Sequence, residues 1–238
     1  MTSISITLPS LKKGHLIVRP NRFLAHVDVE GREILAHVAD PGRLNELLFP
    51  GAEVYVSAAT NPNRKTAFDL KLVQGSRGLV SVDSGMPNRL AKIALEAGVW
   101  PAFTGYDNIK SEPRYKNSRF DFLLHGHDKP DCYLEVKGCT LVEDGVALFP
   151  DAPTARGTRQ VGELTELVGQ GARAAVIFII QRQDVVLFRP HTKMDPAFSR
   201  TLYEAQAAGV EVLAYRCSVT QTEIRLDTTV EIEANFLG

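Results

Sequence analysis

Seven consecutive apolar residues, 174–180, constrain the fold of this chain more than any other segment. The run is far too short to cross a bilayer, so it predicts a buried central strand. A helix is expected before it, over 158–170, because apolar residues recur there on one stripe and Gly171 follows. Asp195, followed by a proline, predicts the start of another helix, and 210–215 reads as a further strand. This alternation of helices and strands favours an α/β sandwich with a mixed sheet.

The first eighty residues instead show short strands separated by glycine and proline. Apolar and polar residues alternate in five segments, 23–29, 34–38, 54–58, 68–72 and 79–82. This pattern favours a small barrel of the OB type, and a helix of one to two turns is expected over 41–48. We therefore predict an α+β chain of two domains, with an N-terminal OB-like five-stranded β-barrel at 1–82.

The second domain, at 83–238, is expected to contain a helix, three strands that include a hairpin, a second helix and a further strand. Its remaining predicted elements are a helix over 87–97, an irregular stretch over 100–117, a strand over 184–188 and one or two strands over 223–233. This order resembles the core of restriction-endonuclease-like nucleases. The prediction is therefore a restriction-endonuclease-like α/β domain with a mixed sheet.

Composition is ordinary for a globular protein. The 238 residues carry a net charge of −1, but residues 1–80 hold ten Lys and Arg against seven Asp and Glu, an excess of +3. This small excess is compatible with a local basic surface and equally with ordinary solvated charges. The three cysteines lack CxxC spacing, which argues for a reduced cytoplasm and against a zinc site. The segment 1–14 shows no secretory signal, so a cytoplasmic protein without a membrane partner is expected.

Two neighbouring strands are expected to bring acids onto one face. Side chains alternate along a strand, so Glu135 and Lys137 point the same way in 133–137, and Asp121 points away from its apolar neighbours in 118–124. If the strands pair, an Asp, a Glu and a Lys share one surface. Two carboxylates can hold a hard divalent cation, and a lysine can orient or help to deprotonate a water. This is the chemistry of phosphodiester hydrolysis.

The spacing of Asp121, Glu135 and Lys137 resembles the PD-(D/E)xK nuclease motif. Such a pattern also occurs by chance on solvent-facing strands, so the neighbouring sequence matters. Further blocks occur in order along the chain: Pro41-Gly42-Arg43-Leu44, Arg64-Lys65-Thr66, Pro87-Asn88, Ser118 to Leu124, Glu135-Val136-Lys137 and Phe149-Pro150-Asp151-Ala152. Together they resemble the sugar fermentation stimulation protein A family over about residues 14–216. The resemblance implies a DNA-binding protein with an OB-like domain followed by a PD-(D/E)xK nuclease-like domain.

The resemblance also implies roles for individual residues. Asp121 and Glu135 would be metal ligands, with the carbonyl oxygen of Val136 as a third, and these hard oxygens favour Mg²⁺, with Mn²⁺ as a substitute. Lys137 would position the attacking water or stabilise charge on the phosphate. Where the family has a histidine after an Arg-Gly step, this chain has Gln160 on the inward stripe of its predicted helix. Gln160 would reach the metal site or a phosphate, and a glutamine bonded to nearby backbone explains the position equally well.

Glu112 and a set of basic residues complete the predicted site. Glu112 precedes Asp121 and is favoured over Glu96 as a further metal ligand. Nucleic-acid contacts are predicted for Arg19, Arg22, Arg43, Arg64, Lys65, Arg119 and Arg156. DNA is favoured over RNA as the partner, and a homodimer is compatible with cleavage of both strands. Two alternatives stay open: a DNA-binding regulator of sugar (maltose) utilisation genes that does not cut, and a hydrolase of a small phosphorylated molecule.

Overall fold

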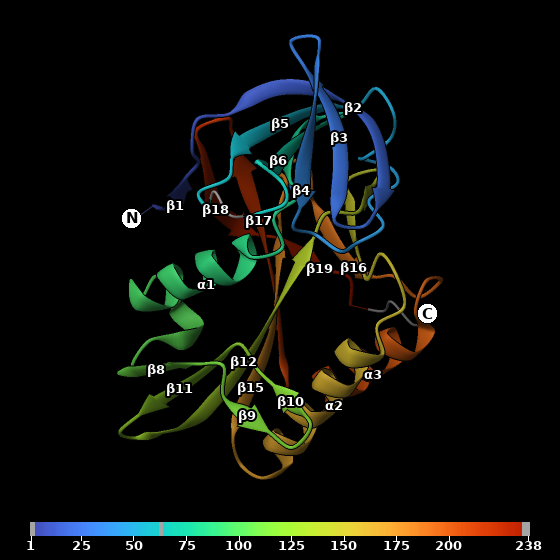
Figure 1. Ribbon diagram of the computed structural model, residues 1–238. Helices are drawn as coiled ribbons and strands as arrows, with labels where there is room; N and C mark the ends of the chain where they lie inside the picture. Colours follow the sequence, from blue (N-terminus) through green and yellow to red (C-terminus); the bar gives the residue numbers. More distant parts are fainter. Residues whose placement is uncertain (1–2, 62–63, 235–238) are drawn as a thin grey trace.

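The computed structural model describes residues 3–61 and 64–234. A β-barrel formed by the first part of the chain sits on an α/β domain formed by the rest (Figure 1). Within the described part of the chain, no helix combines the length and the apolar character needed to span a membrane.

Five strands close the barrel. They are β2 (Lys12–Asn21), β3 (Leu24–Val29), β4 (Arg32–Val38), β5 (Glu53–Ala58) and β6 (Phe68–Gly75). They pair in the order β4-β3-β2-β5-β6, and a parallel β4–β6 pairing closes the ring, which confirms the predicted OB fold. Sequence periodicity misses β2 because register shifts after Leu16 and Val18 interrupt its alternation. The predicted strand 79–82 is β7 (Gly78–Ser81), which pairs with β6 beside the ring.

The segment 41–48 is not a helix, contrary to the prediction. Leu44 has a positive φ of 50°, which breaks the helical path. The N–H groups of Leu47 and Leu48 donate to its carbonyl oxygen at 3.1 and 2.7 Å, and all three leucines are buried in the barrel core. Their helix-like spacing therefore reflects a single tight turn that packs into the barrel.

A mixed seven-stranded sheet forms the α/β domain, as predicted, in the order β1-β18-β17-β15-β12-β11-β8. Its strands are β1 (Ile4–Thr7), β8 (Asn108–Ser111), β11 (Phe122–Gly126), β12 (Lys129–Cys139), β15 (Arg173–Ile180), β17 (Glu211–Val219) and β18 (Glu223–Thr229). β12, β15 and β17 run parallel, and the outer strands pair antiparallel. The N-terminal strand β1 lies within the range 1–82 that the sequence assigns to the barrel, but it pairs with β18 and so belongs to the sheet of the second domain.

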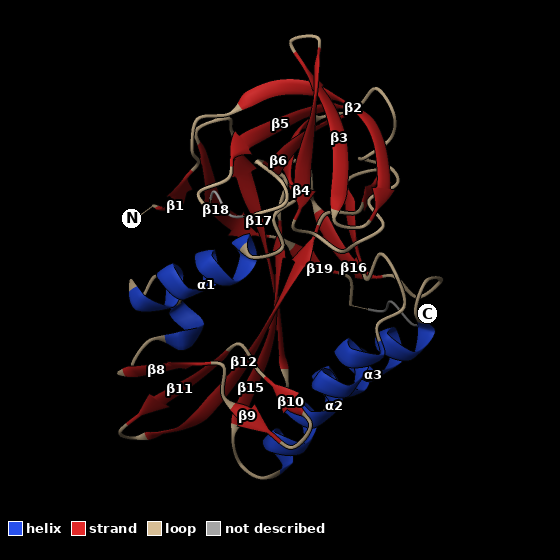
Figure 2. Ribbon diagram, viewed as in Figure 1, coloured by secondary structure: helices blue, strands red, loops and turns tan. Residues whose placement is uncertain are grey.

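Three α-helices in the described residues cover the two faces of this sheet (Figure 2). α1 (Met86–Glu96) packs on one face, and α2 (Ala155–Gly169) and α3 (Pro196–Ala207) pack on the other. Alternate residues of β15 enter the two cores, so Ile177 packs on the α1 side and Phe178 on the α2 side. The apolar run is thus the buried central strand that the sequence predicts.

Smaller elements refine the predictions for the rest of the domain. The stretch 100–117 forms a 3₁₀ helix, η1 (Pro101–Phe103), together with β8 and β9 (Arg114–Tyr115). A bend at Asp121 divides the strand expected over 118–124 into β10 (Ser118–Arg119) and β11. The strand expected over 184–188 begins only at Leu187. β9 and β10 pair as a two-stranded sheet. A four-stranded sheet of the domain consists of β13 (Val142–Glu143), β14 (Val146–Phe149), β16 (Leu187–Pro190) and β19 (Glu231–Ile232).

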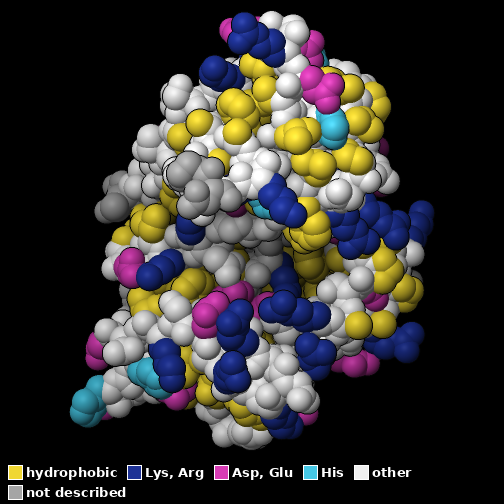
Figure 3. Space-filling model, viewed as in Figure 1, with side chains coloured by type: hydrophobic (Ala, Val, Ile, Leu, Met, Phe, Trp, Pro, Cys, Tyr) yellow, Lys and Arg dark blue, Asp and Glu magenta, His cyan; other side chains and the backbone are white. Residues whose placement is uncertain are grey.

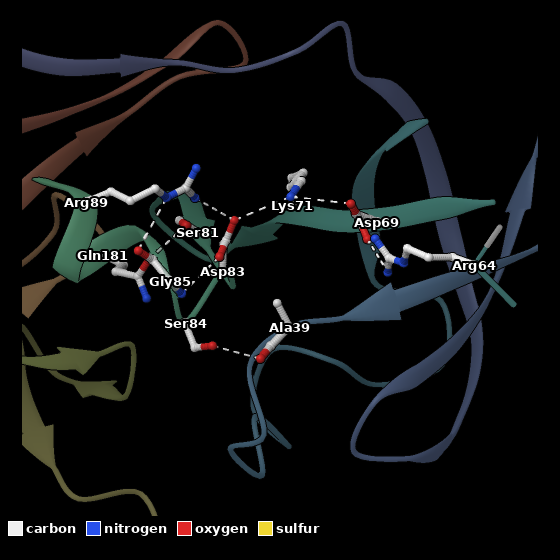
Figure 4. A network of polar contacts seen from close by, with 10 residues as sticks. All are labelled: Ala39, Arg64, Asp69, Lys71, Ser81, Asp83, Ser84, Gly85, Arg89 and Gln181. Atoms are coloured by element: carbon white, nitrogen blue, oxygen red, sulfur yellow. Dashed lines mark hydrogen bonds and ion pairs between the residues drawn. The ribbon is translucent and has the colours of Figure 1, made fainter. Parts of the chain in front are cut away.

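A polar network fixes the barrel to the α/β domain (Figure 4). Ser81, at the end of β7, donates from its hydroxyl to the Gln181 side chain at 2.9 Å and from its N–H to the Gln181 carbonyl at 3.0 Å. Asp83 Oδ2 accepts from Lys71 of β6 at 3.4 Å and from Arg89 of α1 at 2.8 Å. The barrel therefore holds the first turns of α1, a helix that also contributes to the site described next.

Candidate active site

Asp121 lies in the bend between β10 and β11, where β12 and α1 hold its carboxylate. Its backbone N–H donates to the Leu134 carbonyl at 3.1 Å, which keeps the bend in register with β12. Its Oδ2 accepts the N–H of Val136 at 2.7 Å, and its Oδ1 accepts from Asn88 Nδ2 at 2.5 Å. Both carboxylate oxygens are therefore fixed in direction.

Glu135 lies beside Asp121 on β12. The register pairs Phe122 with Leu134, which places Asp121 and Glu135 in adjacent positions on neighbouring strands. Glu135 is 3% exposed, and its Oε1 accepts from Lys137 Nζ at 2.6 Å. Its Oε2 is buried without a hydrogen-bond partner among the described residues. A buried carboxylate oxygen without a donor is costly unless a bound group satisfies it.

Lys137 bridges β12 and α2. Its Nζ donates to Glu135 and also to Gln160 Oε1 at 2.8 Å. Gln160 is 1% exposed, and its Nε2 has no partner among the residues described. The start of α2 is fixed by a cap, because the Thr154 hydroxyl accepts the Gly157 N–H at 3.1 Å. The inward stripe predicted for this helix thus brings Gln160 to Lys137.

Burial raises the pKa values of both carboxyl groups. Burial raises the pKa of Asp121 above its ordinary value, although the hydrogen bonds from Val136 and Asn88 oppose the shift. Burial raises the pKa of Glu135 to about 7; the charge of Lys137 opposes this shift, and the charge of Asp121 adds to it. The raised pKa values mean that the two neighbouring carboxyl groups do not readily carry negative charge at the same time. A divalent cation bound between them would stabilise both charges.

The backbone carbonyl oxygen of Val136 points to the same side of β12 as Asp121. The N–H and C=O of one strand residue point to the same side, and the Val136 N–H points to Asp121. Its carbonyl oxygen therefore faces Asp121 rather than β15. The oxygens of Asp121, Glu135 and Val136 form a set of hard donors.

The structure does not bring Glu112 into this set. Its exposed carboxylate lies 3.5 Å from Arg119 Nη1, and its backbone N–H donates to the Asp121 carbonyl oxygen at 2.9 Å. Among the described residues, no three Asp, Glu, His or Cys side chains group closely enough to hold a metal ion. Arg156, exposed in the first turn of α2, instead adds positive charge, which opposes in small part the rise that burial causes in the pKa values of Asp121 and Glu135.

Three of the predicted nucleic-acid residues share one pocket of the barrel, which we call the basic pocket. It has a volume of about 280 Å³ and is lined in part by Arg19, Arg22 and Arg43. The Arg19 guanidinium donates to the carbonyl oxygens of Arg22, Asp40, Gly42 and Arg43 at 2.5–3.2 Å. Arg19 therefore connects the turn after β2, which contains Arg22, to the loop after β4, which contains Arg43. The side chains of Arg22 and Arg43 are exposed.

The other four predicted contacts do not line the basic pocket. Arg64 pairs with Asp69 at 2.8 Å in the network of Figure 4, and Lys65 is exposed beside it. Arg119 and Arg156 belong to the α/β domain, and both are exposed. Figure 3 shows a hollow between the barrel and the α/β domain, with Lys and Arg side chains along its rims. Basic side chains of both domains therefore border one space.

Fold and site together define a class: a two-domain protein that joins an OB barrel to a mixed-sheet α/β domain in which a half-buried Asp and a half-buried Lys flank a buried Glu. Two family models match this division. The SfsA N-terminal OB domain matches residues 17–82, and the sugar fermentation stimulation protein RE domain matches residues 85–223. The chain belongs to the sugar fermentation stimulation protein (SfsA) family.

Relatives and a solved structure match almost the whole chain. The sugar fermentation stimulation protein homolog of Moorella thermoacetica is 48% identical, over 96% of this chain and 99% of that protein. The homolog of Shewanella baltica is 43% identical, over 92% and 95%. A structure described as Pyrococcus furiosus SfsA in complex with Ca²⁺ is 29% identical, with a TM-score of 0.89 over 98% of this chain and 100% of that chain. Both domains of the fold are thus shared with these relatives.

Sequence reasoning missed Asn88 as a part of the site. The available signal was its place in the Pro87-Asn88 block, which contributes to the family resemblance. Its partner, Asp121, lies 33 positions away, so the packing of α1 against β12 is what brings the two together. Gly138 permits that packing, because a Cβ at this position would lie 3.0 Å from Pro87 Cγ.

Proposed function

We propose that this protein is a metal-dependent nuclease that hydrolyses phosphodiester bonds, with DNA as its preferred substrate. The observation that carries the proposal is the cluster of Asp121, Glu135 and Lys137, in which the buried Glu135 Oε2 has no partner among the described residues. A purely structural ion pair needs neither a second carboxylate beside it nor an unsatisfied buried oxygen. The cluster also matches the PD-(D/E)xK pattern of nucleases in residue type and order.

The donor set fits a hard divalent cation such as Mg²⁺. The carboxylates of Asp121 and Glu135 and the carbonyl oxygen of Val136 would hold it. When bound, the ion would polarise the phosphate and lower the pKa of a bound water. The P. furiosus relative is described as a Ca²⁺ complex, and Ca²⁺ and Mg²⁺ both bind oxygen ligands, which supports a divalent cation in this fold.

Lys137, Gln160 and Arg156 would act on the substrate. Lys137 Nζ would orient the attacking water and stabilise the charge that builds on the phosphate. Gln160 holds this ammonium from α2, so its position does not depend on Glu135 alone. Arg156, exposed at the start of the same helix, would contact a phosphate of the bound strand.

The test is incubation of the purified protein with single- and double-stranded DNA and RNA in Mg²⁺, Mn²⁺ or chelator. We expect metal-dependent cleavage by the wild type and its loss in Asp121→Asn and Lys137→Ala, while nucleic-acid binding is retained. Asp131→Asn and Lys129→Ala are matched controls, because both residues lie at the other end of β12. Cleavage that persists in Asp121→Asn, or that the controls lose equally, would contradict the assignment.

A DNA-binding protein that does not cut is the second candidate, with a role in regulating sugar utilisation that the family name suggests. Two observations favour it: the described residues include no group of three Asp, Glu, His or Cys side chains suited to a metal, and Lys137 already pairs with Glu135. Binding without cleavage under every metal condition would select this regulator. Absence of binding to DNA and RNA would favour a hydrolase of a small phosphorylated molecule.

A further inference from the structure

Phe23, in the turn between β2 and β3, presents an aromatic ring to solvent. The residue is 54% exposed. The His37 ring of β4 lies beside it, with an interplanar angle of 17° and ring centroids 6.5 Å apart. At that separation the two nearly parallel rings overlap little, so each keeps a face that a third ring can cover. The pair therefore has the form of a stacking platform on the barrel surface.

Hydrogen bonds hold this platform in place. The Asn21 side chain accepts the Phe23 N–H at 2.9 Å, and the Phe23 carbonyl accepts the Val38 N–H at 3.0 Å. The same carbonyl lies 3.1 Å from His37 Nδ1. Since a carbonyl oxygen only accepts, the neutral His37 carries its proton on Nδ1, which leaves Nε2 to accept from an N–H group of a base. Rings fixed in advance lose little entropy when a ligand stacks on them.

The basic pocket adjoins the platform. Arg22 directly precedes Phe23 in the chain, and the Arg19 guanidinium ties Arg22 to Arg43 by donating to both of their carbonyl oxygens, at 2.8 and 2.5 Å. The side chains of Arg22 and Arg43 are exposed. Positive charge next to an exposed aromatic ring matches a polyanion that carries aromatic rings of its own, which is the chemistry of a nucleic-acid strand.

We propose that Phe23 and His37 form a base-stacking site for single-stranded nucleic acid whose phosphates lie in the basic pocket. The proposal rests on the proposed function and adds a strand preference to it. Bases in a duplex are already stacked and paired, so a ring on the barrel surface can cover only an unpaired base. The cross-strand register extends the platform, because Val18, His26 and Leu35 lie in one row and both Val18 and Leu35 are exposed.

The Arg43 loop connects this site with the candidate active site. The Arg43 N–H donates to Asp151 Oδ2 of the α/β domain at 2.9 Å. Asp151 lines a small pocket of about 40 Å³ together with Gly138 and Cys139, the residues that follow Lys137 on β12. A strand that stacks on Phe23 and passes through the basic pocket is therefore directed toward the end of β12 that carries the Asp-Glu-Lys cluster.

The experiment measures binding of a labelled single-stranded oligothymidylate by fluorescence anisotropy, in chelator so that no cleavage occurs. We expect Phe23→Ala to weaken binding between about 5- and 150-fold, the range for loss of one stacked base, and Phe23→Trp to restore it. On an oligonucleotide with abasic sites in place of its bases, the effect of Phe23→Ala should vanish. Val186→Ala is the matched control, because Val186 is a 73% exposed apolar residue of the α/β domain.

The outcomes separate this proposal from the nuclease proposal. An unchanged affinity in Phe23→Ala, or an equal loss on abasic and thymidylate strands, would overturn the base-stacking site and leave the nuclease assignment intact. Absence of any nucleic-acid binding by the wild type would overturn both. If binding depends on Phe23 but no metal ion supports cleavage, the result would support the base-stacking site and count against the nuclease proposal.

Discussion

The α/β domain and the barrel hold their charged side chains in opposite ways. In the α/β domain, Glu135 is buried and Asp121 is half-buried, and donors on β12 and α1 fix the direction of their carboxylates. In the barrel, Arg22 and Arg43 are exposed, and Arg19 holds the loops that present them. The difference fits the two tasks that we propose for this protein, cleavage and nucleic-acid binding. Burial shifts pKa values and suits chemistry, whereas exposure suits the recognition of a flexible polyanion.

Lys137→Ala should have the largest effect and tests the buried side of this comparison. Its ammonium is held by Glu135 and Gln160, so its loss removes a fixed positive charge from the reacting phosphate. We expect the cleavage rate to fall by about 10²- to 10³-fold, with affinity in chelator changed by less than about 2-fold. Initial rates on labelled DNA in Mg²⁺ measure this. A fall of the same size in Arg43→Ala would show that the two regions are not functionally separate.

Glu135→Gln should remove most of a pH dependence of stability in the metal-free protein. Burial raises the pKa of Glu135 to about 7, whereas an unfolded chain has a glutamate pKa of about 4.3. Between these values the folded protein holds more protons than the unfolded chain. The free energy of unfolding should therefore fall as the pH rises from about 4.3 to about 7, by up to about 1.4 kcal/mol per pH unit, and level off above.

Urea unfolding in chelator at a series of pH values measures this slope. The raised pKa of Asp121 acts in the same direction, so a smaller slope should remain in Glu135→Gln. A wild-type curve that is flat over this range would contradict a buried, proton-binding Glu135.

Asn88→Ala should have a moderate effect and separates positioning from chemistry. The Asn88 amide donates to Asp121 Oδ1 and favours the charged form of that carboxylate. Its removal should lower cleavage by about 10-fold and move the pH–activity profile to higher pH, because the pKa of Asp121 rises further. Lys92→Ala, on an exposed part of the same helix, should change neither quantity. A lower rate without a shifted profile would assign Asn88 to folding alone.

Arg43→Ala and Arg64→Ala should show the smallest effects and sharpen the exposed side of the comparison. Arg64 is paired with Asp69 at 2.8 Å, whereas Arg43 is exposed. For a single strand, we expect Arg43→Ala to reduce the slope of log affinity against log salt by about 0.7, and Arg64→Ala to reduce it less. Binding titrations at several salt concentrations check this order. The reverse order would place the phosphates along the network of Figure 4.

Local periodicity accounts for the parts of the fold that the sequence predicts. The apolar run and the helical stripe locate β15 and α2 to within a few residues. Bulges hide β2, because the alternation that identifies a strand is interrupted there. A tight turn and a helix both place apolar residues three and four positions apart, so the segment 41–48 resembles a helix until the positive φ of Leu44 is known.

In the candidate site, too, local sequence patterns predict some of the residues, whereas the position of others depends on tertiary packing. Strand alternation on β12 is a local property, and it is enough to group Glu135 with Lys137. The inward stripe of α2 predicts that Gln160 faces the core, but only the family resemblance assigned Gln160 to the site, where it meets Lys137. The contact of Asn88 with Asp121 depends on how α1 packs, which no local pattern encodes. The Glu112 side chain instead forms an exposed ion pair with Arg119. Although Glu112 is close to Asp121 in the sequence, it is therefore not part of the Asp-Glu-Lys cluster.

The position of β1 determines how the two domains of this protein can be separated into fragments. β1 completes the edge of the α/β sheet by pairing with β18, and the strands that follow it build the barrel. In topological terms the barrel is an insertion into the α/β domain rather than a tandem module. A fragment that starts at Asp83 would lack its edge strand and expose β18 to pairing with other chains. Dissection therefore calls for a short connector in place of the barrel, between Leu8 and Asp83, instead of truncation.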